Sequence, residues 1–468
     1  MRDSDGTSIL TEHTLSWLAE RGLCSSATLE VLSNQGLHAL THIQYISFPH
    51  LINKADCFLH ARTGSGKTLA YLMPAIERLK AMEFKTNFGV GCLVVSPTRE
   101  LAQQIRGVLQ PLAKAHNFTS LTLIGGIKES RNDKEMIHAG AVIIVATPGR
   151  LLDAVTRPPG EALPLSKCKI LVLDEADSIL ENKQQTEALK KIYAYLPSDN
   201  LQTVLVSATV DDKSVNLAKD IFSTDFKILS VEKEKNRTST DQIKQNYMLV
   251  SSGDRFSMLI TVLKTLNKKK TIVFFSAGHS VKFHYQLLQR LGLPVLHCFG
   301  RMNQGKRSSV YEQFLQMPTG ILLSTGMAER GWDVPGVQWI IQFDPPHNPQ
   351  DYIHRVGRSG RGEGGKGKAL LFLRPQEQEF LTMLKNMNVD IDQLEFKGDL
   401  QPIQEQVSMT VTKERELQKI AKVAYKKFVR AYQCHKFKKV FNIKNLDLHQ
   451  VCKDFGFVKP PIKLANLI

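Results

Sequence analysis

The sequence lacks the features that would place it in a membrane or an oxidising compartment. No run of about 18 apolar residues occurs, so we expect no membrane-spanning helix. The start of the chain, Met1–Thr11, is polar and carries acidic residues, unlike the apolar core of a secretory signal or a basic transit peptide. The seven cysteines lie far apart, form no Cys-x-x-Cys pair and are odd in number. The pattern favours neither a disulfide framework nor a zinc site, and it fits a reducing compartment.

Lysine and arginine outnumber aspartate and glutamate, which gives the chain a net charge of +16 and a pI of about 9.4. An excess of lysine and arginine favours a polyanionic partner, because neutralising phosphates releases counterions. Charge alone leaves open a basic protein that binds no nucleic acid. The length of 468 residues is too great for one ordinary domain and indicates several, each with its own core.

Short apolar runs alternate with helical patterns over most of the chain. Strand–helix alternation predicts an α/β fold with a mostly parallel, doubly wound sheet. The strands expected in the first half are Cys92–Val95, Val142–Ala146, Ile170–Leu173 and Val204–Val206, separated by helices such as Thr68–Ala81 and Glu100–His116. Those expected in the second half are Thr271–Phe275, Val295–Cys298, Gly320–Ser324, Trp339–Gln342 and Ala369–Leu373. The sequence therefore predicts two α/β domains in tandem.

The composition changes at two places and suggests the domain boundaries. The segment 231–246 is polar and charged and predicts a linker. Near the end, Leu417, Ala421, Ala424 and Phe428 recur at helical spacing, which predicts a small helical appendage with a basic face. The predicted organisation is an N-terminal flank (1–50), a first domain (51–230), a linker (231–246), a second domain (247–400) and a C-terminal extension (401–468).

A glycine-rich segment between an apolar run and a helix is the strongest local signal for nucleotide binding. Its glycines let backbone N–H groups surround a phosphate at a helix N-terminus. The lysine would reach the β- and γ-phosphates, and the threonine hydroxyl would hold Mg²⁺. Taken alone, an ordinary turn before a helix remains an alternative. The segment consists of Ala61, Arg62, Thr63, Gly64, Ser65, Gly66, Lys67 and Thr68.

Three acidic residues follow a second buried strand. The run Ile170–Leu173 leads directly into Asp174, Glu175, Ala176 and Asp177. A carboxylate at a strand end beside a phosphate loop is the usual Mg²⁺ partner in phosphoryl transfer, which predicts Asp174 as a metal ligand. Glu175 would orient or deprotonate the attacking water. Together the two segments predict a hydrolase that uses ATP and Mg²⁺, but they do not yet distinguish a helicase.

At this point the chain resembles the DEAD-box RNA helicases. Asp174–Asp177 is the tetrapeptide that gives the family its name, and the other motifs of the family follow in order. They are Pro97–Ala102, Gly125–Gly126, Thr147–Arg150, Ser207–Thr209, Gln304 with Arg307, Arg330–Asp333 and His354–Arg361. The resemblance implies that both domains are RecA-like P-loop domains, and that the chain couples ATP hydrolysis to local unwinding of RNA.

The resemblance also implies the roles of individual residues. Gln44 would read adenine, with Trp17 as our candidate for stacking on the base, and Asp333 would hold the ribose. Arg355 and Arg358 would act as arginine fingers that meet the γ-phosphate when the two domains close. The implied RNA-binding residues are Thr98, Arg99, Gly126, Thr147, Arg150, Arg307 and Thr325, and the implied coupling residues are Ser207 and Thr209.

The chain departs from the family pattern at several positions. His42 replaces a proline before Gln44, and Gly326, Glu329 and Trp332 are unusual for the fifth motif. This motif and the basic appendage keep open an alternative function, an ATP-gated RNA clamp or assembly scaffold with little unwinding. A DNA helicase is a second rival, which the RNA-type motifs argue against.

The C-terminal segment resembles the appendage of one branch of the family. Phe428–Tyr432, Leu446–Leu448 and Phe455–Phe457 are similar to the nucleolar ribosome-biogenesis helicases of the Set1-associated type. The resemblance implies pre-rRNA and pre-ribosomal proteins as partners, a location in the nucleus and nucleolus, no membrane association and a monomer. A helical cap that only stabilises the second domain is the simpler interpretation of the same segment.

Overall fold

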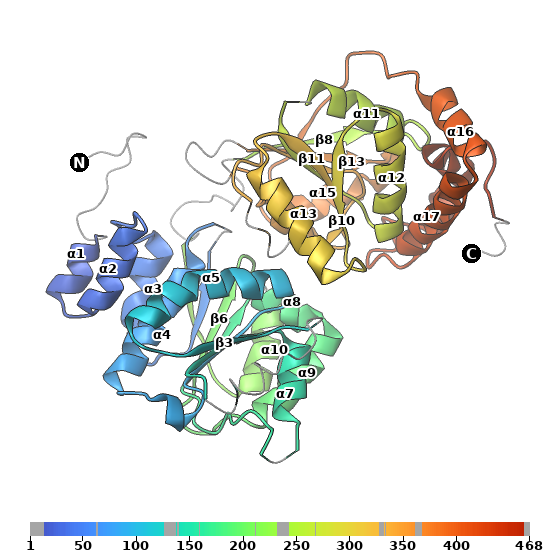
Figure 1. Cartoon of the computed structure of the whole chain (residues 1–468). Helices are drawn as coiled ribbons and strands as arrows, with labels where there is room; N and C mark the ends of the chain where they lie inside the picture. Colours follow the sequence, from blue (N-terminus) through green and yellow to red (C-terminus); the bar gives the residue numbers. More distant parts are fainter. Residues whose placement is uncertain are drawn as a thin grey trace. The chain divides into compact units, whose positions relative to one another are not determined.

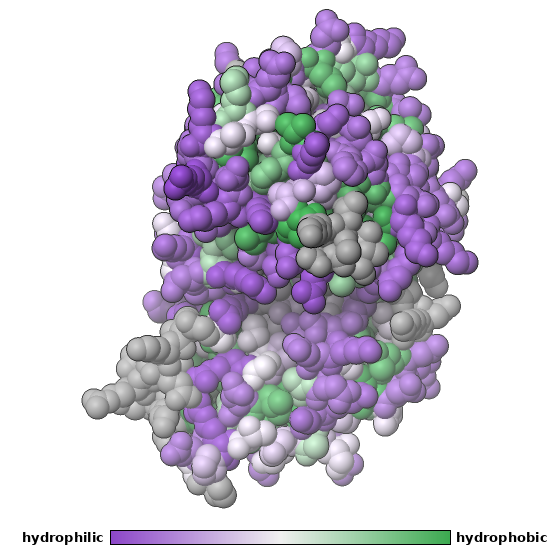
Figure 2. Space-filling view, turned by 90° about the vertical axis from the view of Figure 1, so that its right-hand side faces the viewer, coloured by the Kyte–Doolittle hydropathy of each residue, from purple (hydrophilic) through white to green (hydrophobic). Residues whose placement is uncertain are grey.

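The computed structural model describes residues 14–61, 64–125, 137, 140–158, 160–210, 212–231, 243–266, 268–326, 332, 334–360 and 367–462. The chain divides into two compact units, Met1–Asn236 and Arg237–Ile468, each built around one sheet (Figure 1). No helix in the described ranges is both long enough and apolar enough to span a bilayer. On the face shown in Figure 2, hydrophilic residues predominate and hydrophobic ones are scattered in small groups.

The first unit contains a seven-stranded sheet in which every pairing is parallel. In spatial order its strands are β3 (Ser120–Leu123), β4 (Ile143–Ala146), β2 (Cys92–Val95), β5 (Ile170–Asp174), β6 (Gln202–Ser207), β1 (Cys57–His60) and β7 (Lys227–Ser230). Its helices are α1 (Leu15–Glu20), α2 (Ser26–Asn34), α3 (His42–Ile52), α4 (Lys67–Ala81), α5 (Arg99–Ala115), α7 (Pro148–Val155), α8 (Ala176–Glu181), α9 (Lys183–Tyr193) and α10 (Asp212–Phe222).

Helices cover both faces of this sheet. Successive side chains of a strand point to opposite faces, so one strand contributes to two hydrophobic cores. Leu171 and Leu173 of β5 join the core formed with α7, α8, α9 and α10. Ile170 and Val172 of the same strand join the core formed with α3, α4 and α5. The strand is therefore apolar from Ile170 to Leu173, up to the aspartate that ends it, as expected for a parallel strand buried on both faces.

The second unit contains a second seven-stranded parallel sheet. Its strands in spatial order are β10 (Val295–Cys298), β11 (Gly320–Ser324), β9 (Lys270–Phe274), β12 (Trp339–Gln342), β13 (Gly367–Leu373), β8 (Ile243–Leu249) and β14 (Asp392–Gln393). Its helices are α11 (Arg255–Thr265), α12 (Gly278–Arg290), α13 (Gln304–Gln316), α14 (Pro349–Val356), α15 (Glu379–Lys385), α16 (Gln404–Lys413), α17 (Arg415–Gln433) and α18 (Leu448–Val451).

The C-terminal helices pack directly onto the second unit. In Figure 1, α17 lies beside α12, and its buried residues belong to the same hydrophobic cluster as the sheet. Leu417, Ala421, Ala424 and Phe428 face this core, as their helical spacing predicts, whereas Lys422 and Lys426 are exposed. The extension is thus structurally part of the second unit.

Two features of the predicted domain organisation look different in the structure. β8 begins at Ile243, so the last four residues of the predicted linker, 243–246, form the start of a strand. The preceding residues 232–242 lie outside the described part of the chain. α3 runs from His42 to Ile52 and crosses the expected limit of the N-terminal flank, because its apolar residues pack onto α4.

Candidate functional site

The candidate residues of the first unit follow the carboxyl ends of its parallel strands, the edge where such sheets bind ligands. The phosphate loop follows β1, the acidic tetrapeptide begins in β5, and the Ser207–Thr209 motif follows β6; these three strands are adjacent. Candidate RNA-binding residues follow β2, β3 and β4, which form the other half of the sheet. One edge therefore carries both groups side by side.

The phosphate loop closes around the first turn of α4. Gly66 precedes the helix with φ +82°, a conformation that L side chains rarely adopt. Lys67 is the first helical residue, and its ammonium donates a hydrogen bond to the carbonyl oxygen of Ala61 at 2.5 Å. The lysine therefore spans the loop from end to end. Arg62 and Thr63 lie outside the described residues.

Gln44 packs against the same loop. Its Nε2 donates to the carbonyl oxygen of Gly66 at 3.0 Å, and its Oε1 accepts from the backbone N–H of Thr41 at 2.8 Å. A glutamine amide offers two N–H donors and two lone pairs, so one donor and one acceptor site remain for a base. The ring of Trp17 lies 5.0 Å from that of Tyr45, the residue after Gln44, which brings the candidate stacking residue next to this helix.

The end of β5 holds the two candidate catalytic carboxylates. Asp174 is 4% exposed and accepts hydrogen bonds from the Tyr71 hydroxyl and from the Glu175 backbone N–H, both at 2.9 Å. Burial raises the pKa of Asp174, while the bond from Tyr71 and the charge of Lys67 oppose the rise. Glu175 has φ +48°, so the chain turns sharply after the strand. Strained backbone of this kind often occurs at functional sites.

The residues at this point fit a magnesium ion bound together with a nucleotide. Mg²⁺ takes one or two protein oxygens and completes its shell with phosphates and water. A buried carboxylate is costly to ionise without a cation, which matches the raised pKa of Asp174. No cluster of three or more His, Cys, Asp or Glu that could hold a metal occurs among the described residues. Asp174 and Thr68 would therefore form a sparse ligand pair that needs the phosphates of ATP to complete the shell of the ion.

Hydrogen bonds connect the acidic tetrapeptide, the Ser207–Thr209 motif and the phosphate loop. The Thr209 hydroxyl donates to Asp177 at 2.9 Å, and its backbone N–H donates to the Ser207 hydroxyl at 3.0 Å. The Ser207 carbonyl accepts from the Ala61 N–H at 3.2 Å. The sequence motifs predict no separate role for Asp177, and no motif contains Tyr71. The only available signal for Tyr71 was its place one helical turn after Lys67.

The candidate RNA-binding residues of the first unit lie at helix starts. Thr98 caps α5, with its hydroxyl accepting from the Leu101 N–H at 3.3 Å. Arg99 lies over Gly125, where an added Cβ would be 3.2 Å from the guanidinium. Thr147 precedes α7, which carries Arg150. Helix N-termini and arginines suit phosphate groups. Gly126 lies outside the described residues.

The two candidate arginine fingers belong to the second unit and are buried there. Arg355, in α14, is 3% exposed and lies 5.0 Å from the centre of the Phe274 ring. Its Nη1 donates to the carbonyl oxygen of Asp344 at 3.2 Å. Arg358 donates from Nη1 to the carbonyl oxygen of Trp332 at 3.1 Å. Both guanidinium groups are thus held by carbonyl oxygens at the carboxyl end of the sheet.

The remaining candidates of the second unit follow neighbouring strands. Arg307 is buried in α13, and Thr325 directly follows β11. Asp333 lies outside the described residues, as does most of the unusual fifth motif. Trp332 is 1% exposed and meets Tyr311 edge-on at 5.0 Å. The large ring at this departure from the family pattern is therefore accommodated in the core.

Sequence profiles of three protein families match the chain. The DEAD/DEAH box helicase profile matches residues 41–218, and the helicase conserved C-terminal domain matches residues 254–363. A third profile, the C-terminal extension of ATP-dependent rRNA helicases that are SPB4-like, matches residues 414–463. The three matches follow the order of the two units and the extension.

Similar proteins and structures give the same result. The ATP-dependent RNA helicase HAS1 of Phaeosphaeria nodorum is 41% identical over 97% of this chain and 74% of that protein. The human ATP-dependent RNA helicase DDX18 is 42% identical over 95% of this chain and 66% of that protein. The DEAD-box helicase Mss116 bound to single-stranded RNA and UDP-BeF has a TM-score of 0.86 and 25% identity, covering 96% of this chain and 93% of that chain. Dbp5 of S. cerevisiae bound to RNA and ADP-BeF3 is alike in fold, with a TM-score of 0.72, 24% identity and coverage of 86% and 99%.

The folds, the motif positions and these matches define an ATP-hydrolysing enzyme built from two RecA-like units. The chain belongs to the DEAD/DEAH box helicase family, and it is a DEAD-box RNA helicase that binds ATP. The prediction of this family, and of tandem RecA-like domains with a helical extension, is confirmed. The alternative of an RNA clamp with little unwinding is not favoured.

Proposed function

We propose that the chain hydrolyses ATP with Mg²⁺ in response to RNA and uses the cycle to remodel pre-rRNA during ribosome assembly. Thr68 and Asp174 hold the metal, Lys67 holds the phosphates, and Glu175 orients the attacking water. Arg355 and Arg358 stabilise the negative charge of the transition state. The metal, when bound with ATP, neutralises charge on the phosphates.

One observation carries the link between ATP and RNA. The Thr209 hydroxyl donates a hydrogen bond to Asp177, which lies three residues after Asp174. This bond connects the Ser207–Thr209 motif to the acidic tetrapeptide. Both segments lie at the carboxyl ends of the parallel strands, where the candidate RNA-binding residues also lie. A hydrogen-bonded connection of this kind lets a change at one ligand site bias the other, and such coupling is reciprocal.

RNA-stimulated ATP hydrolysis tests the proposed catalytic roles. The variant Glu175→Gln keeps the size of the side chain but cannot act as a base, so we expect ATP binding to persist while kcat falls by about 10²–10⁴-fold. The variant Glu181→Gln makes the same change at an exposed position of α8 and serves as the matched control. Parental turnover by Glu175→Gln would remove Glu175 from the mechanism. Loss of activity on chelation, restored by Mg²⁺, tests the metal.

The match of residues 414–463 to the extension of rRNA helicases supports rRNA as the target. We infer that the chain acts as a monomer in the nucleolus with pre-ribosomal proteins as partners. Ultraviolet crosslinking of the full chain in cells, followed by sequencing of the bound RNA, should enrich pre-rRNA. Equal recovery of pre-rRNA and unrelated transcripts would refute the assignment. Sedimentation of the purified chain tests the monomer.

A further inference from the structure

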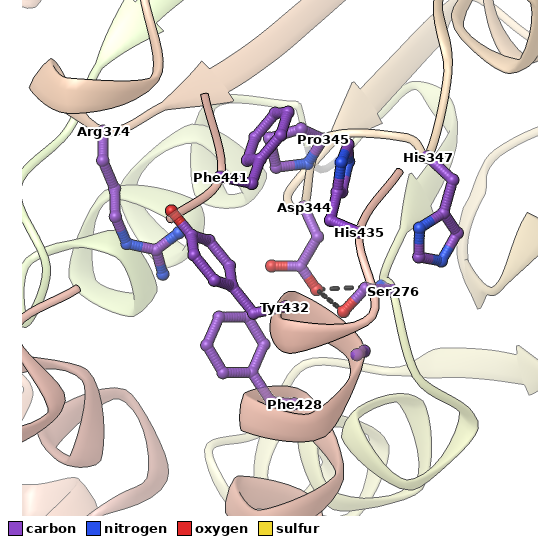
Figure 3. Close-up of a pocket in the computed structure, with 10 residues that line it drawn as sticks. Ser276, Asp344, Pro345, His347, Arg374, Phe428, Tyr432, His435 and Phe441 are labelled. Atoms are coloured by element: carbon purple, nitrogen blue, oxygen red, sulfur yellow. Dashed lines mark hydrogen bonds between the residues drawn. The ribbon is translucent and has the colours of Figure 1, made fainter. Parts of the chain in front are cut away.

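A small pocket lined by both polar and aromatic side chains lies where the end of α17 meets the sheet of the second unit. Its lining includes Ser276, Asp344, Arg374, Tyr432 and His435 (Figure 3). These residues come from the loop after β9, the loop after β12, the end of β13 and the extension. The pocket therefore joins the extension to the loop whose Asp344 carbonyl accepts a hydrogen bond from Arg355.

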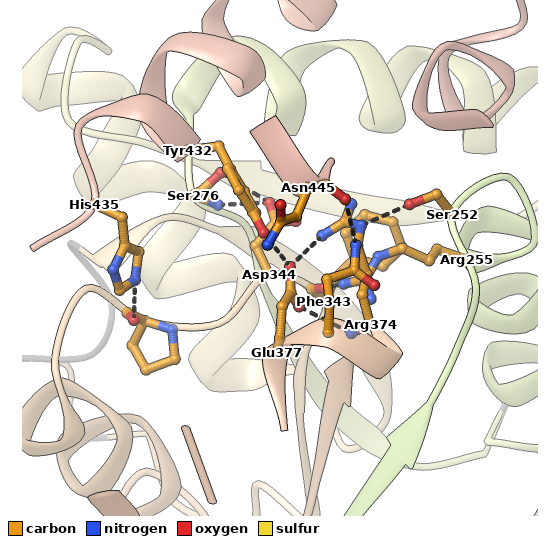
Figure 4. Close-up of polar contacts among 12 residues, drawn as sticks. Ser252, Arg255, Ser276, Phe343, Asp344, Arg374, Glu377, Tyr432, His435 and Asn445 are labelled. Carbon is orange, nitrogen blue, oxygen red and sulfur yellow. Dashed lines mark hydrogen bonds and ion pairs between the residues drawn. The ribbon is translucent and has the colours of Figure 1, made fainter. Parts of the chain in front are cut away.

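One side of the pocket fixes the position of α17. Arg374 forms an ion pair with Glu377 at 3.0 Å, and both side chains are at most 2% exposed. The Tyr432 hydroxyl donates to the same carboxylate oxygen at 2.9 Å, and the Arg374 guanidinium lies 5.4 Å from the centre of the Phe428 ring (Figure 4). The last turns of α17 are thus held by a charge-assisted hydrogen bond from Tyr432 and by the contact of Phe428 with Arg374.

On the other side, His435 reaches the loop after β12. Its Nε2 lies 3.0 Å from the carbonyl oxygen of Pro346, and its Nδ1 accepts from the backbone N–H of Phe437 at 3.2 Å. Because Nδ1 is the acceptor, Nε2 carries the proton and donates to Pro346. Burial lowers the pKa of His435 to about 4, so this neutral form persists at neutral pH. The imidazole ring also packs against the ring of Phe441, with 3.7 Å between the two ring centres.

The loop held by His435 sets the surroundings of Arg355. It connects β12 to α14, and Asn348 caps α14 by accepting from the Asp351 N–H at 2.6 Å. Its second residue, Asp344, accepts from the backbone N–H and the hydroxyl of Ser276 at 2.8 and 3.0 Å. The carbonyl of Asp344 then accepts from Arg355. Two carbonyls of one short loop therefore receive hydrogen bonds from the extension and from the candidate finger.

We propose that His435 is a positioning residue that holds Arg355 in place through the loop after β12. The inference rests on the proposed role of Arg355 as an arginine finger. It gives the extension a part in ATP hydrolysis without contact with ATP or RNA. A misplacement of about 1 Å in a catalytic group can cost about 10²-fold in rate. A single hydrogen bond acting at a distance should cost about 10-fold.

Three substitutions of His435 separate positioning from packing. His435→Phe keeps a ring against Phe441 but removes the donor, so kcat of RNA-stimulated ATP hydrolysis should fall about 10-fold with the KM for ATP unchanged. His435→Gln places an N–H donor near Nε2 and should restore kcat, whereas the shorter His435→Asn should not. The matched control Tyr432→Phe removes another buried hydrogen bond of α17 that does not reach the loop, and it should keep parental kcat.

A double-mutant cycle identifies Arg355 as the group through which His435 acts. In an Arg355→Lys background, His435→Phe should lower kcat by less than twofold, because the group that it positions is already gone. The proposal would be overturned if the effects of the two substitutions on kcat were fully additive, or if His435→Phe kept the parental kcat. If His435→Phe does not fold, the kcat values of His435→Gln and His435→Asn are compared instead. Equal kcat values in these two variants would then overturn the proposal. A parent without RNA-stimulated hydrolysis, or full activity in Arg355→Lys, would instead refute the proposed function.

Discussion

The buried ion pair between Arg374 and Glu377 should contribute far more to stability than an exposed pair of the same spacing. Both side chains are at most 2% exposed. The buried Arg255 guanidinium adds positive charge nearby: burial, together with the charge of Arg374, lowers the pKa of Arg255 to about 10. The variant Glu377→Gln keeps the shape but removes the carboxylate that is ion-paired with Arg374, so that the charges of Asp344 and Asp454 are left to balance the two guanidinium groups. Removing one partner of a buried pair costs about 3–5 kcal/mol.

The chain provides a matched control on its surface. Lys419 and Glu416 form an ion pair with the same three-residue spacing, but their side chains are 72% and 79% exposed. Solvent screens such a pair, so Glu416→Gln should leave the free energy of unfolding almost unchanged. Added salt should erase this small effect and leave the effect of Glu377→Gln nearly unchanged.

Urea unfolding followed by tryptophan fluorescence measures the difference. The chain has three tryptophans, and Trp332 and Trp339 both lie in the second unit. Replacing Trp17 by phenylalanine therefore leaves a fluorescence signal from the second unit alone. This separation is needed because the two units need not unfold in one transition. A loss below about 1 kcal/mol in Glu377→Gln, equal to that of Glu416→Gln, would refute the reasoning.

Three further predictions concern the ATP site. Tyr71→Phe removes a hydrogen bond that lowers the pKa of Asp174, so this pKa should rise. The acid limb of the pH profile of kcat/KM should then move to higher pH, and an unmoved limb would contradict the prediction. Gly66→Ala places a Cβ 2.5 Å from Nε2 of Gln44 at φ +82°, so ATP affinity should fall about 10-fold or more by titration, and parental affinity would contradict it. Thr209→Val breaks the bond to α8 and should lower strand displacement more than ATP hydrolysis, whereas equal losses would argue against coupling.

Much of the fold follows from the sequence, because buried parallel strands are marked by local composition. The runs predicted at Cys92–Val95, Val295–Cys298 and Trp339–Gln342 coincide with β2, β10 and β12. Several other strands differ from their prediction by one or two residues at an end. The strand β8 was missed because Ile243 is followed by three consecutive polar residues, 244–246, which resemble a linker. Its exposed Lys244 and half-buried Tyr247 show that this strand lies near an edge of the sheet.

The candidate ATP site could be predicted because its residues form short local motifs. The contacts that orient these residues could not, since they join distant parts of the chain. Tyr71 reaches Asp174 across 103 positions, and His435 reaches Pro346 across 89. A tyrosine or histidine at these places has no local pattern that distinguishes a buried hydrogen-bond donor from an ordinary core residue.

The shared core of the second unit and the extension has a practical consequence for deletion studies. Phe455 packs on Phe283 at 5.6 Å and on Phe428 at 5.9 Å, so aromatic rings from both parts interlock. Cutting the chain before α16 would strip this covering from α12 and expose rings that water does not solvate well. A truncated protein that loses activity would then show only that the second unit has been damaged, and the role of the extension itself is better tested by point substitutions that leave these rings in place.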